Sequence, residues 1–188
     1  MNILSNSNIL ILTLCIIILI LAFVCYKLKE KLSRYEADRP IIKFRDTHNK
    51  NYYHKLFNKY RNQISAVDAM SGTDFEILCG SIIQAQGFNN VYNTRASGDF
   101  GVDLIAEKDG LKYAIQCKCY AKPVGVSAVQ EIYCGCKFYG CDVAVVISNQ
   151  NYTEAADELA RAVGVNLWGR KWMLEAIKIY IKDYNKRR

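Results

Sequence analysis

Three side chains in the segment 97–120 could together bind a metal ion and act on a phosphodiester. Asp103 supplies a carboxylate, Gln116 an amide oxygen and Lys118 an ammonium group. Carboxylate and amide oxygens are hard ligands of the kind that Mg²⁺ binds, and Mg²⁺ usually keeps positions for water or a substrate phosphate. Such an ion polarises the phosphate and helps to generate hydroxide, while a lysine can orient the water or balance developing charge. The residue types indicate metal-assisted cleavage of a phosphodiester.

An Asp-Gly pair at 109–110 predicts how these residues come together. It separates two apolar-rich runs, and such a pair between β-type runs favours a two-residue type I′ turn. That turn would place Asp103 directly opposite Gln116, with Lys118 on the diagonal. The Cβ atoms of such neighbours lie about 5 Å apart when opposite and about 7–8 Å apart on the diagonal. The alternative is a surface hairpin with an ordinary Asp–Lys contact, because these residue types are common on strand faces.

The order of motifs around this hairpin resembles a known nuclease family, the catalytic domain of the Mrr-type restriction endonucleases. The resemblance covers residues 70–177 and is carried by four segments: G-T-D-F-E at 72–76, D-F-G-V-D-L-I-A at 99–106, Y-A-I-Q-C-K-C-Y at 113–120 and V-G-V-S-A-V-Q-E-I at 124–132. That domain is a branch of the PD-(D/E)xK superfamily in which Q-x-K often replaces E-x-K. The sequence departs from the family at Phe100, where glycine is frequent.

The resemblance assigns roles to five residues. It implies that Asp103 and Gln116 are metal ligands and that Lys118 is the catalytic lysine. Glu76 and Gln130 match helix positions that often line the active site of this family. The implied activity is Mg²⁺-dependent endonucleolytic cleavage of DNA, with Mn²⁺ as a substitute, usually in restriction of foreign or modified DNA. Because the Gln ligand carries no charge, we expect modest metal affinity until a DNA phosphate joins the ligands.

The predicted helices around these residues bear on the roles of Glu76 and Gln130. Thr73 opens a capping-box pattern in which Glu76 would reach back to the helix start, so Glu76 is either a helix cap or an active-site carboxylate. Gln130 and its neighbour Glu131 lie about one turn into a helix that Ser127 is predicted to cap. Both are close enough in the chain to the Lys118 strand to reach the site.

Residues 9–26 form a run without a charged side chain, rich in Ile and Leu. At a rise of about 1.5 Å per residue this run is just long enough to span a bilayer core, so it predicts a transmembrane helix. A cleaved signal peptide is the alternative, but residues 1–8 carry no basic charge and no convincing cleavage site follows. Four basic residues follow within 27–34. The positive-inside rule therefore predicts an extracytoplasmic N-terminus (1–8) and a cytoplasmic catalytic domain.

Residues 27–69 are predicted to be a basic juxtamembrane linker ending in an amphipathic helix. Eleven basic and four acidic residues between 27 and 65 give this stretch a net charge of +7. The charge could attract anionic lipid headgroups or DNA phosphates, or it could belong to a solvated spacer. Lys55, Lys59 and Arg61 alternate with tyrosines and are weak candidates for nucleic-acid contacts, although packing of this helix is favoured. Lys122 is a further weak candidate.

The eight cysteines fit no C-x-x-C framework, and we interpret them as free thiols. Cys117 and Cys119 should point away from the face of Gln116 and Lys118, into the core, because side chains alternate along a strand. Cys134 and Cys136 diverge if they lie on a helix. This disfavours a zinc site.

The fold predicted for residues 70–182 is an α/β, restriction-endonuclease-like domain with a central mixed sheet flanked by helices, followed by a basic tail at 183–188. Alternating strand and helix patterns support it. The predicted strands are 91–95, 102–108, 111–120, 142–148 and 165–168, with helices between and after them.

The function predicted from the sequence is a membrane-anchored, Mg²⁺-dependent DNA endonuclease. A catalytically inactive, membrane-tethered module that binds DNA or lipid on the same fold is the alternative, motivated by the uncharged Gln116 and the basic linker. DNA and the membrane are the expected partners. A homodimer is also expected, because cutting both strands usually needs two sites.

Overall fold

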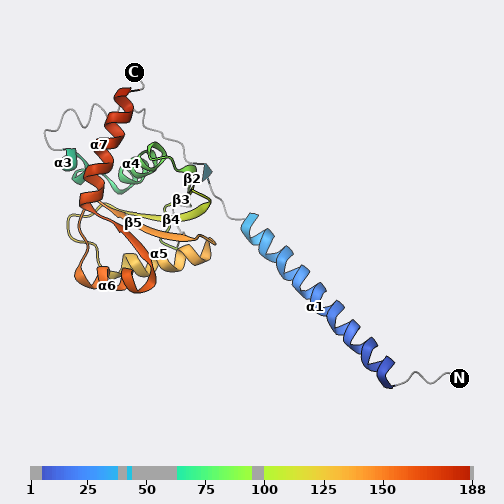
Figure 1. Ribbon diagram of the computed structural model, residues 1–188. Helices are drawn as coiled ribbons and strands as arrows, with labels where there is room; N and C mark the ends of the chain where they lie inside the picture. The colour runs from blue at the N-terminus through green and yellow to red at the C-terminus, as the bar shows by residue number, and fades with distance from the viewer. Residues whose placement is uncertain (1–5, 38–41, 44–62, 95–99, 187–188) are drawn as a thin grey trace. The chain divides into compact units, whose positions relative to one another are not determined.

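The structure is a computed structural model that describes residues 6–37, 42–43, 63–94 and 100–186 (Figure 1). The chain divides into two compact units, Met1–Pro40 and Ile41–Arg188. The predicted nucleic-acid contacts of Lys55, Lys59 and Arg61 lie outside the described residues.

The first unit contains one helix, α1 (Asn6–Ala37). Among the residues that the structure describes, no helix has the length and apolarity needed to cross a membrane. The predicted transmembrane helix at 9–26 is therefore not confirmed.

The second unit is built around a mixed sheet. The described strands lie in the order β1-β2-β3-β4-β5-β6, antiparallel from β1 to β4 and parallel from β4 to β6. The bounds are β1 Ile42–Lys43, β2 Asn89–Asn93, β3 Leu104–Lys108, β4 Leu111–Lys118, β5 Val143–Ser148 and β6 Val165–Trp168. The hairpin β3–β4 thus joins an antiparallel half to a parallel half, so the proposed site residues lie on the central strands.

Helices cover both faces of the sheet, as Figure 1 shows for the labelled elements. One hydrophobic core contains residues of α3 (Gln63–Asp68), α4 (Gly72–Ala85) and α7 (Arg170–Lys186). The other contains residues of α5 (Val126–Phe138) and α6 (Glu154–Val163). The predicted α/β fold with a mixed sheet flanked by helices is confirmed. The predicted tail at 183–188 is helical as far as Lys186, because α7 continues past the predicted boundary.

The alternation of side chains along β4 decides which residues share a face. Ile115 and Cys117 belong to the core under α4 and α7, whereas Ala114 belongs to the core under α5 and α6. Gln116 and Lys118 follow Ala114 at a spacing of two and therefore lie on the α5 face. The prediction that Cys117 points away from them into the core is confirmed, since its side chain is buried under the opposite helices.

The hairpin register is confirmed. Lys108 pairs with Leu111, and the pairing continues to Leu104 opposite Ile115. The turn residues Asp109 and Gly110 both have positive φ, at 53° and 78°, as a type I′ turn requires. The Asp-Gly dipeptide therefore fixes the parity of both strands, and with it the face on which each side chain lies.

Candidate active site

Asp103 lies one residue before β3, just beyond the last regular pair of the hairpin, Leu104 opposite Ile115. Its backbone N–H donates to the carbonyl of Ile115 at 2.9 Å. Its Oδ2 accepts from the backbone N–H of Cys117 at 2.6 Å. Cys117 stands between Gln116 and Lys118, so this hydrogen bond holds the carboxylate beside the segment that carries the other two predicted residues.

Gln116 is almost fully buried, with 1% of its surface exposed. Its Nε2 donates to Oε2 of Glu131 on α5 at 2.7 Å. Its Oε1 is buried and has no hydrogen-bond partner in the structure. A buried oxygen without a partner costs about 1–3 kcal/mol relative to a satisfied one. The amide oxygen is thus an unused ligand atom at the place where the sequence predicts a metal.

Lys118 is the last residue of β4, and its ammonium group forms an ion pair with Oε2 of Glu131 at 3.0 Å. Burial alone would lower the pKa of Lys118, but the hydrogen bond and charge of Glu131, with smaller contributions from Tyr120 and Asp103, raise it above its ordinary value. Lys118 is therefore a cation at neutral pH. This favours a role in neutralising charge or orienting water rather than in taking up a proton.

The structure places Glu131, rather than Gln130, against the predicted site. Gln130 is exposed, whereas Glu131 contacts both Gln116 and Lys118. The reason is the phase of α5, in which Ala128 and Ile132 face the sheet. Glu131 is three residues beyond Ala128 and shares its side of the helix, while Gln130 is turned about 100° away from Glu131.

Helix α5 begins at a different residue from the one that the sequence predicted. The predicted cap at Ser127 is wrong: the helix begins at Val126 with Gly125 as its N-cap, and no side chain caps it. The sequence placed both Gln130 and Glu131 near the site, but it could not choose between them without knowing which face of the helix packs on the sheet.

Glu76 is not the helix cap that the sequence allowed. Ser71 is the N-cap of α4: its hydroxyl accepts from the backbone N–H of Asp74 at 3.1 Å and donates to the Asp74 carboxylate at 2.8 Å. Glu76 lies in the following turn, half-buried. Burial and Cys79 raise the pKa of the Cys117 thiol, and the charges of Asp103 and Glu76 add to that rise. The charges of both carboxylates therefore raise the pKa of the same thiol on β4.

Two glycines let the loop before Asp103 lie directly on α5. A methyl group at Gly101 would come within 2.7 Å of both Nε2 of Gln116 and Cβ of Glu131. A methyl group at Gly135 would come within 2.5 Å of the Phe100 carbonyl oxygen. Phe100 itself has a φ of 53°, and its ring lies 4.2 Å from that of Phe138. The residue that departs from the family pattern thus packs the loop against the helix.

We expect Gly101→Ala to destabilise the domain more than Gly110→Ala. Both glycines have positive φ, at 75° and 78°, so alanine is strained at either position, but only at Gly101 would the new methyl group meet neighbours. The clash should cost about 1–3 kcal/mol beyond the shared backbone strain. Free energies of unfolding from denaturant titration would test this. Equal destabilisation of the two variants would show that the loop does not need this close approach.

The segment after Lys118 is fixed by a buried asparagine. Asn149 is fully buried; its Oδ1 accepts from the Tyr120 N–H at 2.8 Å and its Nδ2 donates to the Tyr120 carbonyl at 2.9 Å. Asn149 and Arg170 also donate to the Asp68 carboxylate. Although burial alone would raise the pKa of Asp68, these hydrogen bonds hold it below its ordinary value. This network ties the end of β4 to α3 and α7. Lys122 is exposed in the same loop.

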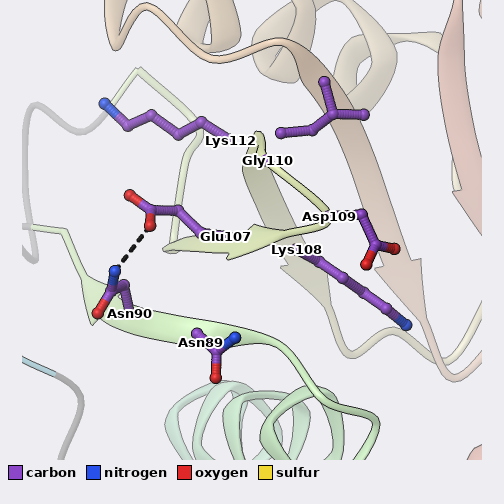
Figure 2. A pocket seen from close by; sticks show the side chains of 8 residues that line it. Asn89, Asn90, Glu107, Lys108, Asp109, Gly110 and Lys112 are labelled. Atoms are coloured by element: carbon purple, nitrogen blue, oxygen red, sulfur yellow. Dashed lines mark hydrogen bonds between the residues drawn. The ribbon is translucent and has the colours of Figure 1, made fainter.

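A hollow beside the hairpin turn is separate from this site. It measures about 420 Å³ and lies at the turn, where Asn90 donates to Glu107 at 2.7 Å (Figure 2). Its lining residues are Asn89, Asn90, Glu107, Lys108, Asp109, Gly110, Leu111 and Lys112. Asp103 and Gln116 lie at the other end of the two strands, so this hollow carries none of the predicted chemistry.

A metal ion would fit the donor set around Asp103 and Gln116. In the part of the chain that the structure describes, no three His, Cys, Asp or Glu side chains are grouped as a metal site. A divalent cation would therefore depend on an uncharged donor such as the amide oxygen of Gln116 in addition to the carboxylate of Asp103. That oxygen is buried and without a hydrogen-bond partner, which fits a ligand atom. Oxygen donors of this kind suit Mg²⁺ or Mn²⁺.

The mixed sheet and the D…Q-x-K arrangement on its central hairpin are features of a restriction-endonuclease-like domain. Residues 67–177 match the model of the Mrr_cat family, which is described as restriction endonuclease. Because this match covers more than half of the chain, the protein belongs to that restriction endonuclease family.

Comparison with curated proteins and with solved structures finds similarity over part of the chain. An uncharacterized protein of Archaeoglobus fulgidus is 27% identical in a 96-residue alignment that covers 47% of this chain and 55% of that protein. The chain thus matches about half the length of this curated relative.

Two solved structures are also similar to part of this chain. One is the protein of unknown function AF1548, with a TM-score of 0.44 and 22% identity over 57% of this chain and 64% of that chain. The other is the DNA modification-dependent restriction endonuclease AspBHI, with a TM-score of 0.46 and 14% identity over 74% of this chain and 40% of that chain.

Proposed function

We propose that this protein is a divalent-metal-dependent DNA endonuclease whose active site contains Asp103, Gln116 and Lys118. The observation that carries the proposal is the buried Oε1 of Gln116, which has no hydrogen-bond partner and lies on the strand whose next residue binds the Asp103 carboxylate. Membership of the restriction endonuclease family supports DNA as the substrate. Restriction of foreign or modified DNA is the biological role that we propose for this activity.

The residues have separate tasks in this proposal. Asp103 and Gln116 would hold Mg²⁺, or Mn²⁺ in its place. When bound, such an ion polarises the phosphate and lowers the pKa of water so that hydroxide is available as the nucleophile. Lys118, a cation held at the end of β4, would orient the attacking water or stabilise the charge that develops on the phosphate. Glu76 could supply a further carboxylate from α4.

The proposal is tested by incubating the purified full-length protein with supercoiled plasmid, both methylated and unmethylated. We expect nicked or linear product in Mg²⁺ or Mn²⁺ and none in EDTA, with activity returning when metal is restored. Cutting that persists in EDTA would contradict a metal-dependent site. A folded protein that binds DNA but never cuts it would favour the binding module that the neutral Gln116 suggested.

A further inference from the structure

Two polar side chains of β4 meet the same carboxylate oxygen on α5. Gln116 Nε2 lies 2.7 Å from Oε2 of Glu131, and Lys118 Nζ lies 3.0 Å from that oxygen. Gln116 and Lys118 are two residues apart on one face of the strand, so a single carboxylate on the helix that packs on this face can contact both side chains. The residue that joins the predicted metal ligand to the predicted catalytic lysine is thus one to which the family resemblance gave no role.

Glu131 determines which end of the Gln116 amide has no hydrogen-bond partner. An ionised carboxylate can only accept hydrogen bonds, so only the N–H₂ end of the amide can face it favourably. The carbonyl end of Gln116 must then point the other way, and its Oε1 is the buried atom that has no hydrogen-bond partner. Without an acceptor at this position, the amide could rotate and offer nitrogen, which does not bind Mg²⁺, in place of oxygen.

The close packing of the loop at Gly101 supports this arrangement. A methyl group there would meet both Nε2 of Gln116 and Cβ of Glu131, so the absence of a side chain leaves room for the two residues to pair. The Glu131 side chain is 46% exposed, whereas Gln116 is buried. The carboxylate can therefore stay hydrated while its oxygen reaches an amide in the interior, which avoids the cost of burying a charge.

We propose that Glu131 is a positioning residue for the metal ligand: it holds the Gln116 amide with Oε1 available to a cation and provides the negative charge that Gln116 lacks. This inference rests on the proposed function. A carboxylate that accepts from a ligand's N–H fixes the orientation of the ligand and makes its donor atom more basic, and loss of such a partner typically weakens metal binding about 10- to 100-fold. A surface ion pair with Lys118 alone would have no such effect.

The first test measures Mn²⁺ binding by calorimetry in the full-length protein and its Glu131→Gln variant. The introduced amide could donate to Gln116 Oε1 as readily as it could accept from Nε2, so the variant loses both the charge and the preferred orientation. We expect Mn²⁺ binding about 10- to 100-fold weaker, with an unchanged melting temperature. Glu158→Gln on α6, also exposed, is the matched control and should bind as the wild type does. Wild-type affinity in Glu131→Gln would overturn the proposal.

A charge swap separates positioning from a general structural role. Gln116→Glu alone places two carboxylates where an amide and a carboxylate now lie 2.7 Å apart, so they should repel each other. The double variant Gln116→Glu/Glu131→Gln restores one charge and one N–H···O hydrogen bond with the direction reversed. We expect the double variant to bind Mn²⁺ at least as tightly as the wild type. Failure of this rescue in a folded double variant would overturn the proposal.

The Asp103→Asn variant distinguishes failure of this inference from failure of the proposed function. If the wild type binds Mn²⁺, Asp103→Asn does not, and Glu131→Gln binds normally, the metal site stands and only the role of Glu131 is wrong. If the folded wild type binds no Mn²⁺, the proposed metal site and the role of Glu131 both fail.

Discussion

Asp103→Asn should reduce metal-dependent DNA cleavage by about 1,000-fold or more, because a bound cation contributes several kcal/mol of transition-state stabilisation and each 1.36 kcal/mol is a factor of ten in rate. Asparagine keeps the size of the side chain and can still accept from the Cys117 N–H, so the hairpin should fold normally. What is lost is the only anionic side chain that we assign as a metal ligand. The effect should appear in initial cleavage rates and in Mn²⁺ binding together.

The hairpin offers a matched control for this substitution. Asp109→Asn makes the same chemical change at the exposed turn, and Asn-Gly forms the same type I′ turn as Asp-Gly. This variant should cut DNA at the wild-type rate. Wild-type cleavage by a folded Asp103→Asn protein would rule out Asp103 as a required metal ligand.

Lys118→Met is expected to slow the chemical step about 100- to 1,000-fold, the usual cost of removing one group that stabilises developing charge. Methionine keeps most of the apolar stem but removes the cation. Metal binding should be retained, because Lys118 is not an assigned ligand. The measurement is the single-turnover rate with saturating DNA and Mg²⁺, beside Mn²⁺ affinity.

Lys178→Met on α7 is the control for Lys118→Met. Lys178 is exposed and forms an ion pair with Glu175, a neighbour on its own helix. This variant should behave as the wild type in both measurements. If Lys118→Met cleaves within a few-fold of the wild-type rate, or if it loses metal binding instead, the role assigned to Lys118 is wrong.

The hairpin could be predicted from sequence because its register depends on two adjacent residues. Asp109 and Gly110 both tolerate positive φ, and a two-residue turn fixes which side chains share a face. The pairs from Lys108–Leu111 to Leu104–Ile115 followed from that parity, whereas the predicted pairing of Asp103 with Gln116 lies beyond the last regular pair and stays a prediction. The burial of Cys117 on the opposite face followed from the same alternation.

The contacts made by the helices could not be predicted in the same way, because successive side chains of a helix point about 100° apart and no single turn fixes which of them packs on the sheet. Ser71 and Thr73 are both good N-cap residues, and the buried residues Phe75 and Leu78 fit either start. At α5, the packing of Ala128 and Ile132 on the sheet brings Glu131, rather than Gln130, to the site. The apolar run at 9–26 identified a helix, but composition alone did not determine whether that helix crosses a membrane.

The most direct test of the nuclease site is a plasmid-cleavage assay in Mg²⁺ with three full-length proteins prepared in parallel: wild type, Asp103→Asn and Lys118→Met. We predict that the wild type converts supercoiled DNA to nicked or linear product and that both folded variants leave it supercoiled over the same period. Equal cutting by all three proteins would show that the activity belongs to another site or to a contaminant. No cutting by the wild type, on either methylated or unmethylated plasmid, would contradict the proposed endonuclease function.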